Sequence, residues 1–438
     1  MAEVKPFRGT RYNPSVINDL ALVTTPPFDV ISDEQRSVYH ERHPKNIIRL
    51  TLGETMPGDD AETNWYSRAA QYFEQWLDDG VLIQDKEPAF YLLRRDYVDK
   101  WGRERTRYGF TGLVRIEDPD KGVILGHEMT FDDVIVDRLR LVEATRANLC
   151  PIFALYSDPE GEAVRALRSS VSEPLATVPL EDGSTDTVWV ADDAEACRLV
   201  SDTVKDSAIF IADGHHRYAT VRLYRNEMRR KEGSNSGSEP FDYTMMTLVA
   251  LEDEGLAIYP PHRLVKGLRN FDAEAFLTEL EDYFEVVPML HPVTLHEQVE
   301  TLVRLMADSD EGAPRFGLLL KDTAPRLLTL RHEANAHPWL SGIQENAWKE
   351  LDVPILHRLV IEGMLNVSSS SGGHIAYDAD EFEAAELVQS NEVQMALLLN
   401  PPTPDDVKKV SLAGALMPHK STYFYPKLLT GLVMHKMY

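Results

Sequence analysis

Hydrophobic positions recur along the chain with two different periods, and together they predict a protein that mixes helices and strands. Between residues 65 and 77 the apolar side chains return every three to four positions, which predicts an amphipathic helix that ends at Gly80. The segments AFYLLRR and YGFTGLVRI are short and rich in aromatic and branched residues, which predicts paired strands. A helical pattern over residues 133–146 then precedes PIFALYS, a candidate buried strand.

The second half of the chain also alternates helical and strand patterns. DAEAFLTELEDYF has the helical period, whereas RFGLLL and QMALLLN are short apolar runs typical of strands. We find no internal repeat. We therefore expect a mixed α+β fold, with an N-terminal α+β domain over residues 1–270 and a C-terminal α/β region over residues 271–438 that packs against it.

Composition and charge narrow the functional classes. The chain has 438 residues, of which 43% are hydrophobic and 26% charged, as in a globular protein of two or three domains. Its formal net charge of −26 argues against general binding to nucleic acid or anionic lipid. No run approaches the ~20 apolar residues of a membrane span, and the first residues hold no apolar run of signal-peptide length. With only Cys150 and Cys197, the chain fits a reducing compartment, and we expect a cytoplasmic protein.

The most specific local pattern is SAIFIADGHHRYATVRLY, which predicts a strand, a glycine turn and a helix. The glycine allows a sharp turn and a close ligand approach, and the first amides of the following helix point outward without partners. The pattern therefore predicts an anion cradle for the phosphates of a nucleotide. We assign this cradle to Asp213, Gly214, His215, His216 and Arg217. The alternative is that Asp213 caps the helix and the two histidines are ordinary, partly buried residues.

Adjacent histidines also raise the question of a metal site. His215 and His216 point in different directions at a helix start, and neither is followed by a Cys or acidic residue three or four positions on. We therefore predict no metal site formed by side chains at this turn. A metal-dependent hydrolase that uses His127, His215 and His216 is kept as an alternative.

Several long motifs are similar to those of a known family. ADGHHRYATV, PFRGTRYNP, PPFDVIS, HRLV and MPHKSTYFYPKLLTGLV resemble a widespread family of bacterial and archaeal proteins classed as a domain of unknown function. The likeness runs nearly from end to end of the chain, but the family name implies no activity.

A second, local resemblance does imply an activity. The strand–DGHHR–helix turn is similar to the phosphate-binding turn of the ParB/sulfiredoxin superfamily, which implies a nucleotide-binding core elaborated with further helices and strands. Sulfiredoxin has a cysteine where this chain has His215, so thiol chemistry is not implied. DNA binding of the ParB kind is disfavoured by the charge of −26. The free serine kinases of this superfamily remain compatible, and they imply ATP or ADP as the nucleotide together with Mg²⁺.

Phosphoryl transfer also needs a group that accepts the proton of the attacking hydroxyl. Asp29 in PPFDVIS is one candidate, because its Pro-Pro-aromatic setting is an unusual way to build a loop; the alternative is a turn or helix cap. Glu128 is the other, with His127 beside it, since a carboxylate can tune an imidazole for acid–base work. The alternative for this pair is that it belongs to the capping region of the following helix.

The C-terminal segment MPHKSTYFYPK contains a second polar cluster. Lys420, Ser421 and Thr422 place a cation beside two hydroxyls, which suits a phosphate or carboxylate of the substrate. The glycines of a Walker loop do not precede it. A structural role is equally compatible, and sequence alone does not show whether this segment meets the DGHHR turn.

These observations lead to one functional hypothesis and two alternatives. The hypothesis is a nucleotide-dependent phosphotransferase, a small-molecule kinase, acting on a small hydroxylated metabolite such as free serine. Its partners are then the nucleotide and the metabolite, without nucleic acid or membrane, and a homodimer stays open. The alternatives are a non-catalytic nucleotide-binding sensor and the metal-dependent hydrolase.

Overall fold

The computed structural model describes residues 1–234, 236–289, 294–308, 312–336, 338–341, 351–367, 373–418 and 420–438. Its chain divides into two compact units. Unit 1 comprises Met1–Gly126, Thr130–Leu256 and Pro426–Tyr438, and unit 2 comprises His127–Met129 and Ala257–Tyr425. Most of unit 2 is thus inserted between two segments of unit 1. The packing of residues 271–438 against residues 1–270 stays a prediction.

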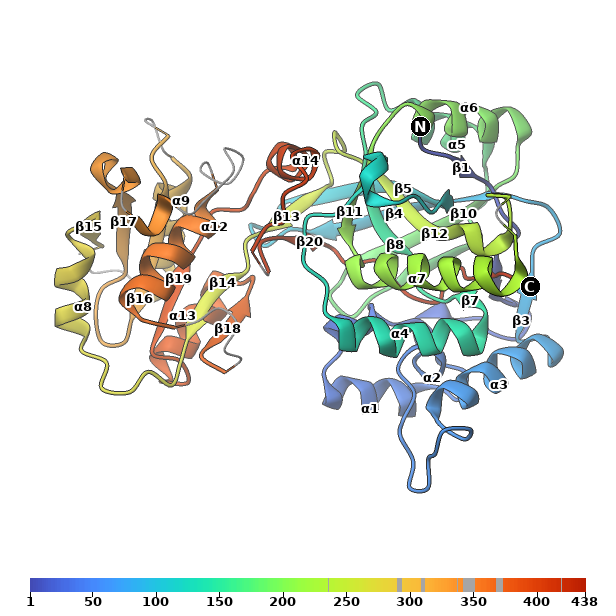
Figure 1. Cartoon of the computed structure of the whole chain (residues 1–438), viewed down its shortest axis with the longest axis horizontal. Coiled ribbons are helices and arrows are strands. Elements are labelled where there is room, and N and C mark those ends of the chain that lie inside the picture. The colour runs from blue at the N-terminus through green and yellow to red at the C-terminus, as the bar shows by residue number, and fades with distance from the viewer. Residues whose placement is uncertain are drawn as a thin grey trace. The chain divides into compact units, whose positions relative to one another are not determined.

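A nine-stranded mixed sheet forms the centre of unit 1 (Figure 1). Its two longest strands pair antiparallel from Tyr91 opposite Thr111 to Val98 opposite Glu104, which confirms the predicted strand pair. Only two neighbouring pairs, β6 with β11 and β8 with β12, are parallel. Along the sheet the strands are β6 (Ile124–Leu125), β11 (Ile209–Asp213), β8 (Ile152–Tyr156), β12 (Tyr243–Ala250), β5 (Glu104–Arg115), β4 (Phe90–Val98), β10 (Thr185–Ala191) and β9 (Ala176–Pro179), and β1 (Val4–Lys5) pairs with β5.

Helices cover both faces of this sheet (Figure 1). α5 and α6 pack together on one face, while α4 and α7 pack together on the other, with α3 against α4. The helices of unit 1 are α1 (Asp33–Arg42), α2 (Ile48–Thr51), α3 (Trp65–Asp78), α4 (Asp132–Thr145), α5 (Glu162–Ser170), α6 (Ala194–Lys205) and α7 (His215–Glu232). Two short strand pairs add β2 (Thr10–Tyr12) to β3 (Leu82–Gln84) and β7 (Ala147–Asn148) to β21 (His435–Lys436).

Local sequence signals account for several helix ends. Ser32 caps α1 and forms a capping box with Gln35, as the polar residues at this position predict. α3 buries its apolar face, including Phe73 and Trp76, and Gly80 follows it at φ 68°. α7 ends before Gly233 with basic residues in its last turn, where they complement the helix dipole.

Unit 2 is built on a six-stranded antiparallel sheet. Side chains along β16 alternate between two apolar clusters, with Phe316 and Leu318 on one face and Leu319 on the other, so both faces are covered. The strands in order are β15 (Phe284–Pro288), β17 (Arg326–Leu330), β16 (Arg315–Leu320), β19 (Met395–Leu398), β14 (His262–Val265) and β18 (Ile375–Asp378). Its helices are α8 (Ala273–Leu280), α9 (Leu295–Ala307), α10 (Pro338–Ser341), α12 (Asp352–Ile355), the π-helix Leu356–Met364, α13 (Glu381–Gln389) and α14 (Pro404–Leu412).

Unit 2 also contains the two strands next to its connections with unit 1. β13 (Ala257–Tyr259) and β20 (Tyr423–Tyr425) pair antiparallel, with Ala257 opposite Tyr425. The points where the chain leaves and re-enters unit 1 are therefore held side by side.

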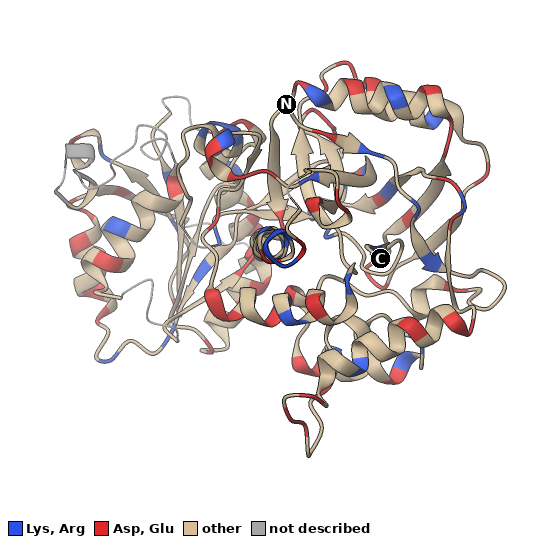
Figure 2. Cartoon of the chain, turned by 45° about the vertical axis from the view of Figure 1, so that its right-hand side comes forward, with Lys and Arg blue, Asp and Glu red and all other residues tan. Residues whose placement is uncertain are grey.

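Acidic residues are spread along the helices and loops of both units, with Lys and Arg among them (Figure 2). Within the described ranges, no helix is both long and apolar enough to cross a membrane. The mixed α/β fold predicted from the sequence is confirmed.

The buried ion pair between β4 and β10 gives a stability prediction. Arg95 and Asp186 lie opposite each other in register, and both side chains are almost fully buried. We expect Arg95→Met to lower the free energy of unfolding by about 3–5 kcal/mol, because it leaves a buried carboxylate without its partner. The neighbouring Arg94, paired with Asp96 at the surface, provides the control: Arg94→Met should cost less than about 1 kcal/mol. Urea denaturation measures both, and equal losses would contradict the prediction.

Candidate functional site

The turn between β11 and α7 places a helix N-terminus at the end of a strand. β11 ends at Asp213 and α7 begins at His215, with Gly214 between them at φ 93°. A Cβ added to Gly214 would lie 2.8 Å from Nε of Arg217, so the glycine lets this guanidinium fold back onto the turn. The N-cap residue Gly214 has no side chain to form a capping hydrogen bond at this positive end of the helix dipole.

Two cations hold the carboxylate of Asp213. Nζ of Lys427 donates to Oδ1 and Nη2 of Arg217 donates to Oδ2. Desolvation acts to raise the pKa of Asp213, but the charges of Lys427 and Arg217 outweigh it and hold the pKa well below the ordinary range. Asp213 is therefore ionised at neutral pH.

Arg217 also connects the turn to the segment before β8. Its Nη1 donates to Sγ of Cys150 at 2.9 Å and to the carbonyl of Pro151. Oγ1 of Thr430 donates to the same sulfur at 3.0 Å. Burial raises the pKa of the Cys150 thiol. Because both Nη atoms already donate to protein groups, Arg217 orders the turn, and its direct contact with a phosphate stays a prediction.

Asp29 lies near enough to the turn to respond to its charges. It sits in a short 3-10 helix, Phe28–Val30, that the extended Pro27 precedes, and its side chain is exposed. The surrounding protein nonetheless displaces water from the carboxylate, and this desolvation raises the pKa of Asp29. The negative charge of Asp213 raises it further, against the opposing effect of Arg217. The structure thus brings two predicted site residues, Asp29 and Asp213, into one electrostatic neighbourhood.

The two histidines of the turn have different surroundings. His215 is buried, and a Cβ on Gly126 would lie 2.9 Å from its Cδ2. His216 is half-buried; its Nε2 accepts a hydrogen bond from the backbone N–H of Phe131 at 3.0 Å, and the two rings stack. Since Nε2 accepts, the neutral ring of His216 carries its proton on Nδ1.

The remaining predicted residues belong to unit 2. His127 is fully buried, and its Nε2 lies 3.0 Å from Oγ1 of Thr422. Ser421 donates to the carbonyl of Pro418 at 2.6 Å, while Lys420 is exposed at φ 56°. Glu128 is half-buried. The structure therefore joins His127 to the Lys420–Thr422 cluster, and the contact of that cluster with the DGHHR turn stays a prediction.

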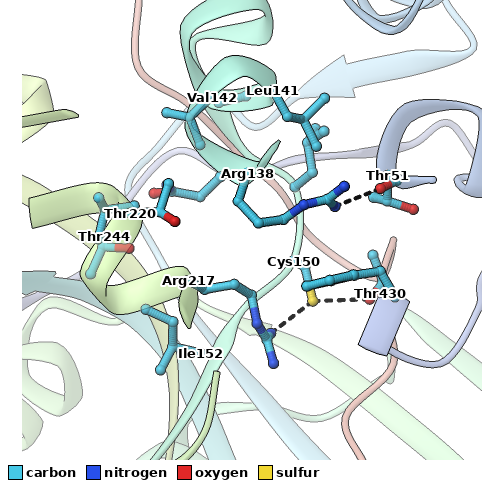
Figure 3. Close-up of a pocket in the computed structure, with 15 residues that line it drawn as sticks. Thr51, Arg138, Leu141, Val142, Cys150, Ile152, Arg217, Thr220, Thr244 and Thr430 are labelled. Carbon is cyan, nitrogen blue, oxygen red and sulfur yellow. Dashed lines mark hydrogen bonds between the residues drawn. The ribbon is translucent and has the colours of Figure 1, made fainter. Parts of the chain in front are cut away.

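A cavity of about 60 Å³ opens beside the turn within unit 1 (Figure 3). Arg138 of α4 reaches Thr51, while Arg217 of α7 reaches Cys150, which lies beside Thr430. Hydrophobic side chains form much of the rest of the wall. The lining residues are Phe28, Thr51, Arg138, Leu141, Val142, Ala147, Asn148, Leu149, Cys150, Ile152, Arg217, Thr220, Val221, Thr244 and Thr430.

Sequence reasoning did not assign Lys427, Thr430 or Arg138 to the site. Lys427 and Thr430 both lie in the long C-terminal motif MPHKSTYFYPKLLTGLV, so the motif itself was the available signal. Arg138 forms an ion pair with Asp137, its neighbour in the chain, which is the role that the sequence alone favours for it. Nothing in the spacing of these residues indicated that they would share one cavity wall.

Comparisons with known proteins give one family and several distant structures. A profile of DUF1015, described as a protein of unknown function, matches residues 4–354. No protein of curated function matches the chain. Among solved structures, the chain is similar to a free serine kinase in complex with AMP, at 14% identity and a TM-score of 0.32, over 72% of this chain and 90% of that chain.

Two further solved structures have the same level of similarity. One is a conserved hypothetical protein from Pyrococcus furiosus, at 13% identity and a TM-score of 0.33, over 72% of this chain and 94% of that chain. The other is SbnI from Staphylococcus aureus with a C-terminal truncation, at 12% identity and a TM-score of 0.34, over 74% of this chain and 87% of that chain. Because these TM-scores are low, we derive the function from this chain's own residues.

The ion pairs of Asp213 predict a pH-dependent contribution to stability. A carboxylate with a lowered folded-state pKa stabilises the fold above its ordinary value of 3.8, and this contribution is lost as the pH falls below that value. We expect the free energy of unfolding of Asp213→Asn to be clearly lower than that of the wild type at pH 7. The difference between the two free energies should narrow by about 1 kcal/mol as the pH falls from 5 to 3. Urea denaturation across this range measures it. A difference that does not change with pH would show that Asp213 is not held ionised by Lys427 and Arg217.

Proposed function

Because this chain belongs to the DUF1015 family, whose description names no activity, we propose its function from the site itself: a nucleotide-dependent phosphotransferase that acts on a small hydroxylated metabolite. One observation carries the proposal. Two neighbouring carboxylates, Asp29 and Asp213, have pKa values shifted in opposite directions by their surroundings. Two titratable groups whose pKa values are shifted in opposite directions are typical of an active site, where one acts as acid or base and the other stays charged.

Asp29 is the group that accepts the proton of the attacking hydroxyl. It is exposed to an approaching substrate, and its raised pKa brings it closer to the neutral range, where a general base works best. In the reaction, the substrate oxygen forms a bond to the terminal phosphorus, the bond from that phosphorus to the nucleotide breaks, and the hydroxyl proton passes to Asp29. Glu128 and His127 remain the alternative assignment.

The phosphates of the nucleotide lie at the start of α7. Gly214 permits a close approach of the backbone, and the helix has no side-chain cap of its own at this end. We assign Lys427 to the phosphates, since its ammonium group meets Asp213 at this turn and its side chain is partly exposed. In this proposal Arg217 acts mainly by holding Asp213 and the turn in place.

ATP or ADP with Mg²⁺ fits these residues. Within the described ranges, no group of three or more His, Cys, Asp or Glu side chains is placed to hold a metal ion. Mg²⁺ in nucleotide sites needs only one or two carboxylates, because the phosphates and water complete its shell. Asp213, which stays ionised, would supply one such carboxylate, and the ion would neutralise charge on the phosphates.

The fold of unit 1 supports the same proposal in a general way. We infer that the strand–turn–helix of β11 and α7 belongs to a nucleotide-binding core of the ParB/sulfiredoxin kind, extended by the other helices and strands. The partners in this proposal are a nucleotide and a small molecule.

A non-catalytic nucleotide sensor is the second candidate, because a cradle for phosphate does not by itself require turnover. The two candidates differ in what Asp29 does. A sensor has no use for a proton acceptor beside the phosphates, whereas a phosphotransferase depends on one.

Calorimetric titration tests nucleotide binding. ATP, ADP and CTP are titrated into the full chain with and without Mg²⁺, and we expect at least one to bind. Lys427→Met should weaken that binding by about 10-fold or more, because a charge-assisted contact to phosphate is lost. Lys436→Met, which removes another lysine of the same C-terminal segment, serves as the control because Lys436 pairs with Glu74. No heat with any nucleotide would contradict the proposal.

Turnover separates the kinase from the sensor. With a panel of hydroxylated metabolites, Asp29→Asn should lower the rate by about 100- to 10,000-fold while nucleotide affinity changes little. The exposed Asp33, a few residues further on, provides the control variant Asp33→Asn. In the wild type the rate should rise with pH through the raised pKa of Asp29, since only the ionised carboxylate accepts a proton. Nucleotide binding without any phosphorylated product would favour the sensor.

A further inference from the structure

The cavity beside the turn is lined by two deeply buried guanidinium groups. Arg138 is 5% exposed and Arg217 is 9% exposed, and the two come from different helices, α4 and α7 (Figure 3). Burying two cations along one small cavity is costly unless anions balance them. The balance of charge around the cavity therefore indicates what it can hold.

The acidic partners of these cations are few. Arg138 pairs with Asp137, its neighbour in α4. Arg217 pairs with Asp213, but Asp213 also serves Lys427. Asp213 therefore lies between two cations, and Asp29, whose pKa is raised, is the other acid beside the turn. A bound anion would give the two buried guanidinium groups a further negative partner.

The guanidinium groups also retain N–H donors. Arg138 uses Nε and Nη2 for Asp137 and Nη1 for the carbonyl of Thr51 at 2.7 Å. A guanidinium carries five N–H groups, so within the described part of the chain one N–H on each Nη atom of Arg138 has no acceptor. Arg217 uses Nη2 for Asp213 alone, which leaves a second N–H on that atom. These remaining N–H groups are the donors that each arginine would offer to a small anion in the cavity.

The size and the walls of the cavity indicate which anion. A water molecule needs about 10–15 Å³ of such volume, so 60 Å³ accommodates about four to six groups of that size. Leu141, Val142, Leu149, Ile152 and Val221 make much of the wall apolar. A phosphate dianion requires polar partners on all sides, whereas a short carboxylic acid has one charged end and a hydrocarbon stem. The cavity suits the carboxylic acid.

The lining also discriminates between hydroxy acids and amino acids. None of the described residues that line the cavity is acidic, so an ammonium group placed in it would have no carboxylate partner. The threonine hydroxyls of the wall can instead accept from, or donate to, a substrate hydroxyl. Phe28 lines the cavity and Asp29 follows it directly in the chain, so the proton acceptor is next to this wall.

We propose that this cavity binds the carboxylate end of the acceptor substrate, and that this substrate is a short hydroxy carboxylic acid in preference to an amino acid. The inference rests on the phosphotransferase function proposed above. Arg138 and Arg217 bind the carboxylate, the apolar wall packs against the carbon chain, and the hydroxyl of the acid extends toward Asp29. Free serine is then a poor substrate, because its ammonium group has no partner here.

The proposed preference for hydroxy acids is tested by measuring the binding of small acids to the full-length wild type. Glycolate, lactate and glycerate are the probes, with L-serine, glycerol and inorganic phosphate as comparators in ligand-observed NMR and calorimetry. We expect at least one hydroxy acid to bind at least 10-fold more tightly than L-serine, and glycerol not to bind. Equal or tighter binding of L-serine or of inorganic phosphate would overturn the inference.

A matched pair of variants in α4 assigns the binding to the cavity. Arg138→Met should lower the affinity for the hydroxy acid by about 10- to 100-fold, because charge-assisted hydrogen bonds are lost. It should leave the affinity for the nucleotide unchanged. Arg140→Met, two residues further along the same helix at an exposed position, should change neither. Unchanged hydroxy-acid binding in a folded Arg138→Met protein would refute the assignment.

The cysteines provide a readout that needs no substitution. Cys150 lines the cavity, whereas Cys197 is buried elsewhere in unit 1. A hydroxy acid in the cavity should slow alkylation of Cys150 by iodoacetamide and leave the rate at Cys197 unchanged, as mass spectrometry measures. Protection of neither residue at saturating acid would overturn the inference. Nucleotide binding without hydroxy-acid binding would refute only the cavity assignment, whereas hydroxy-acid binding without nucleotide binding would refute only the phosphotransferase.

Discussion

The ion pairs of Asp213 are the interaction on which the candidate site depends. They join the end of β11, the first turn of α7 and the C-terminal segment Pro426–Tyr438 through one carboxylate. Both cations stabilise the ionised form of Asp213 against its desolvation, so the turn keeps a fixed negative charge at neutral pH. That charge in turn acts on Asp29 and helps to separate the pKa values of the two acids. The guanidinium of Arg217, one of these two cations, also donates to Cys150 and so connects the turn to the cavity wall.

Local parts of this architecture could be predicted from the sequence. The paired strands β4 and β5, the capped start of α1 and the strand–glycine–helix at Gly214 all follow from short-range patterns. Each depends on residues that are neighbours in sequence, where the hydrophobic period and the backbone preference act on the same few positions. Asp29 was also selected from its local setting, and the structure brings it near the turn.

The long-range parts could not be predicted in the same way. Lys427 follows an aromatic strand of unit 2 in the sequence, yet it belongs to unit 1 and meets Asp213. Arginine is a residue type that commonly binds phosphate. The hydrogen bonds of Arg217, however, go to Asp213, Cys150 and Pro151, which only the folded chain brings together. Likewise, a pattern of apolar positions in α4 does not show that Arg138 will be buried beside a cavity. These features arise from contacts between segments that no sequence period relates.

The insertion of unit 2 between Leu256 and Pro426 has a consequence for how the site forms during synthesis. A ribosome makes Asp29, Cys150, Asp213 and Arg217 early, but Lys427 and Thr430 appear only after nearly all of unit 2 has been translated. Until then Asp213 has one of its two cations, and the strand β7 waits for its partner β21. The nascent chain therefore carries an incomplete turn for about half of its translation, and nearly all of unit 2 is translated before Lys427 completes the site.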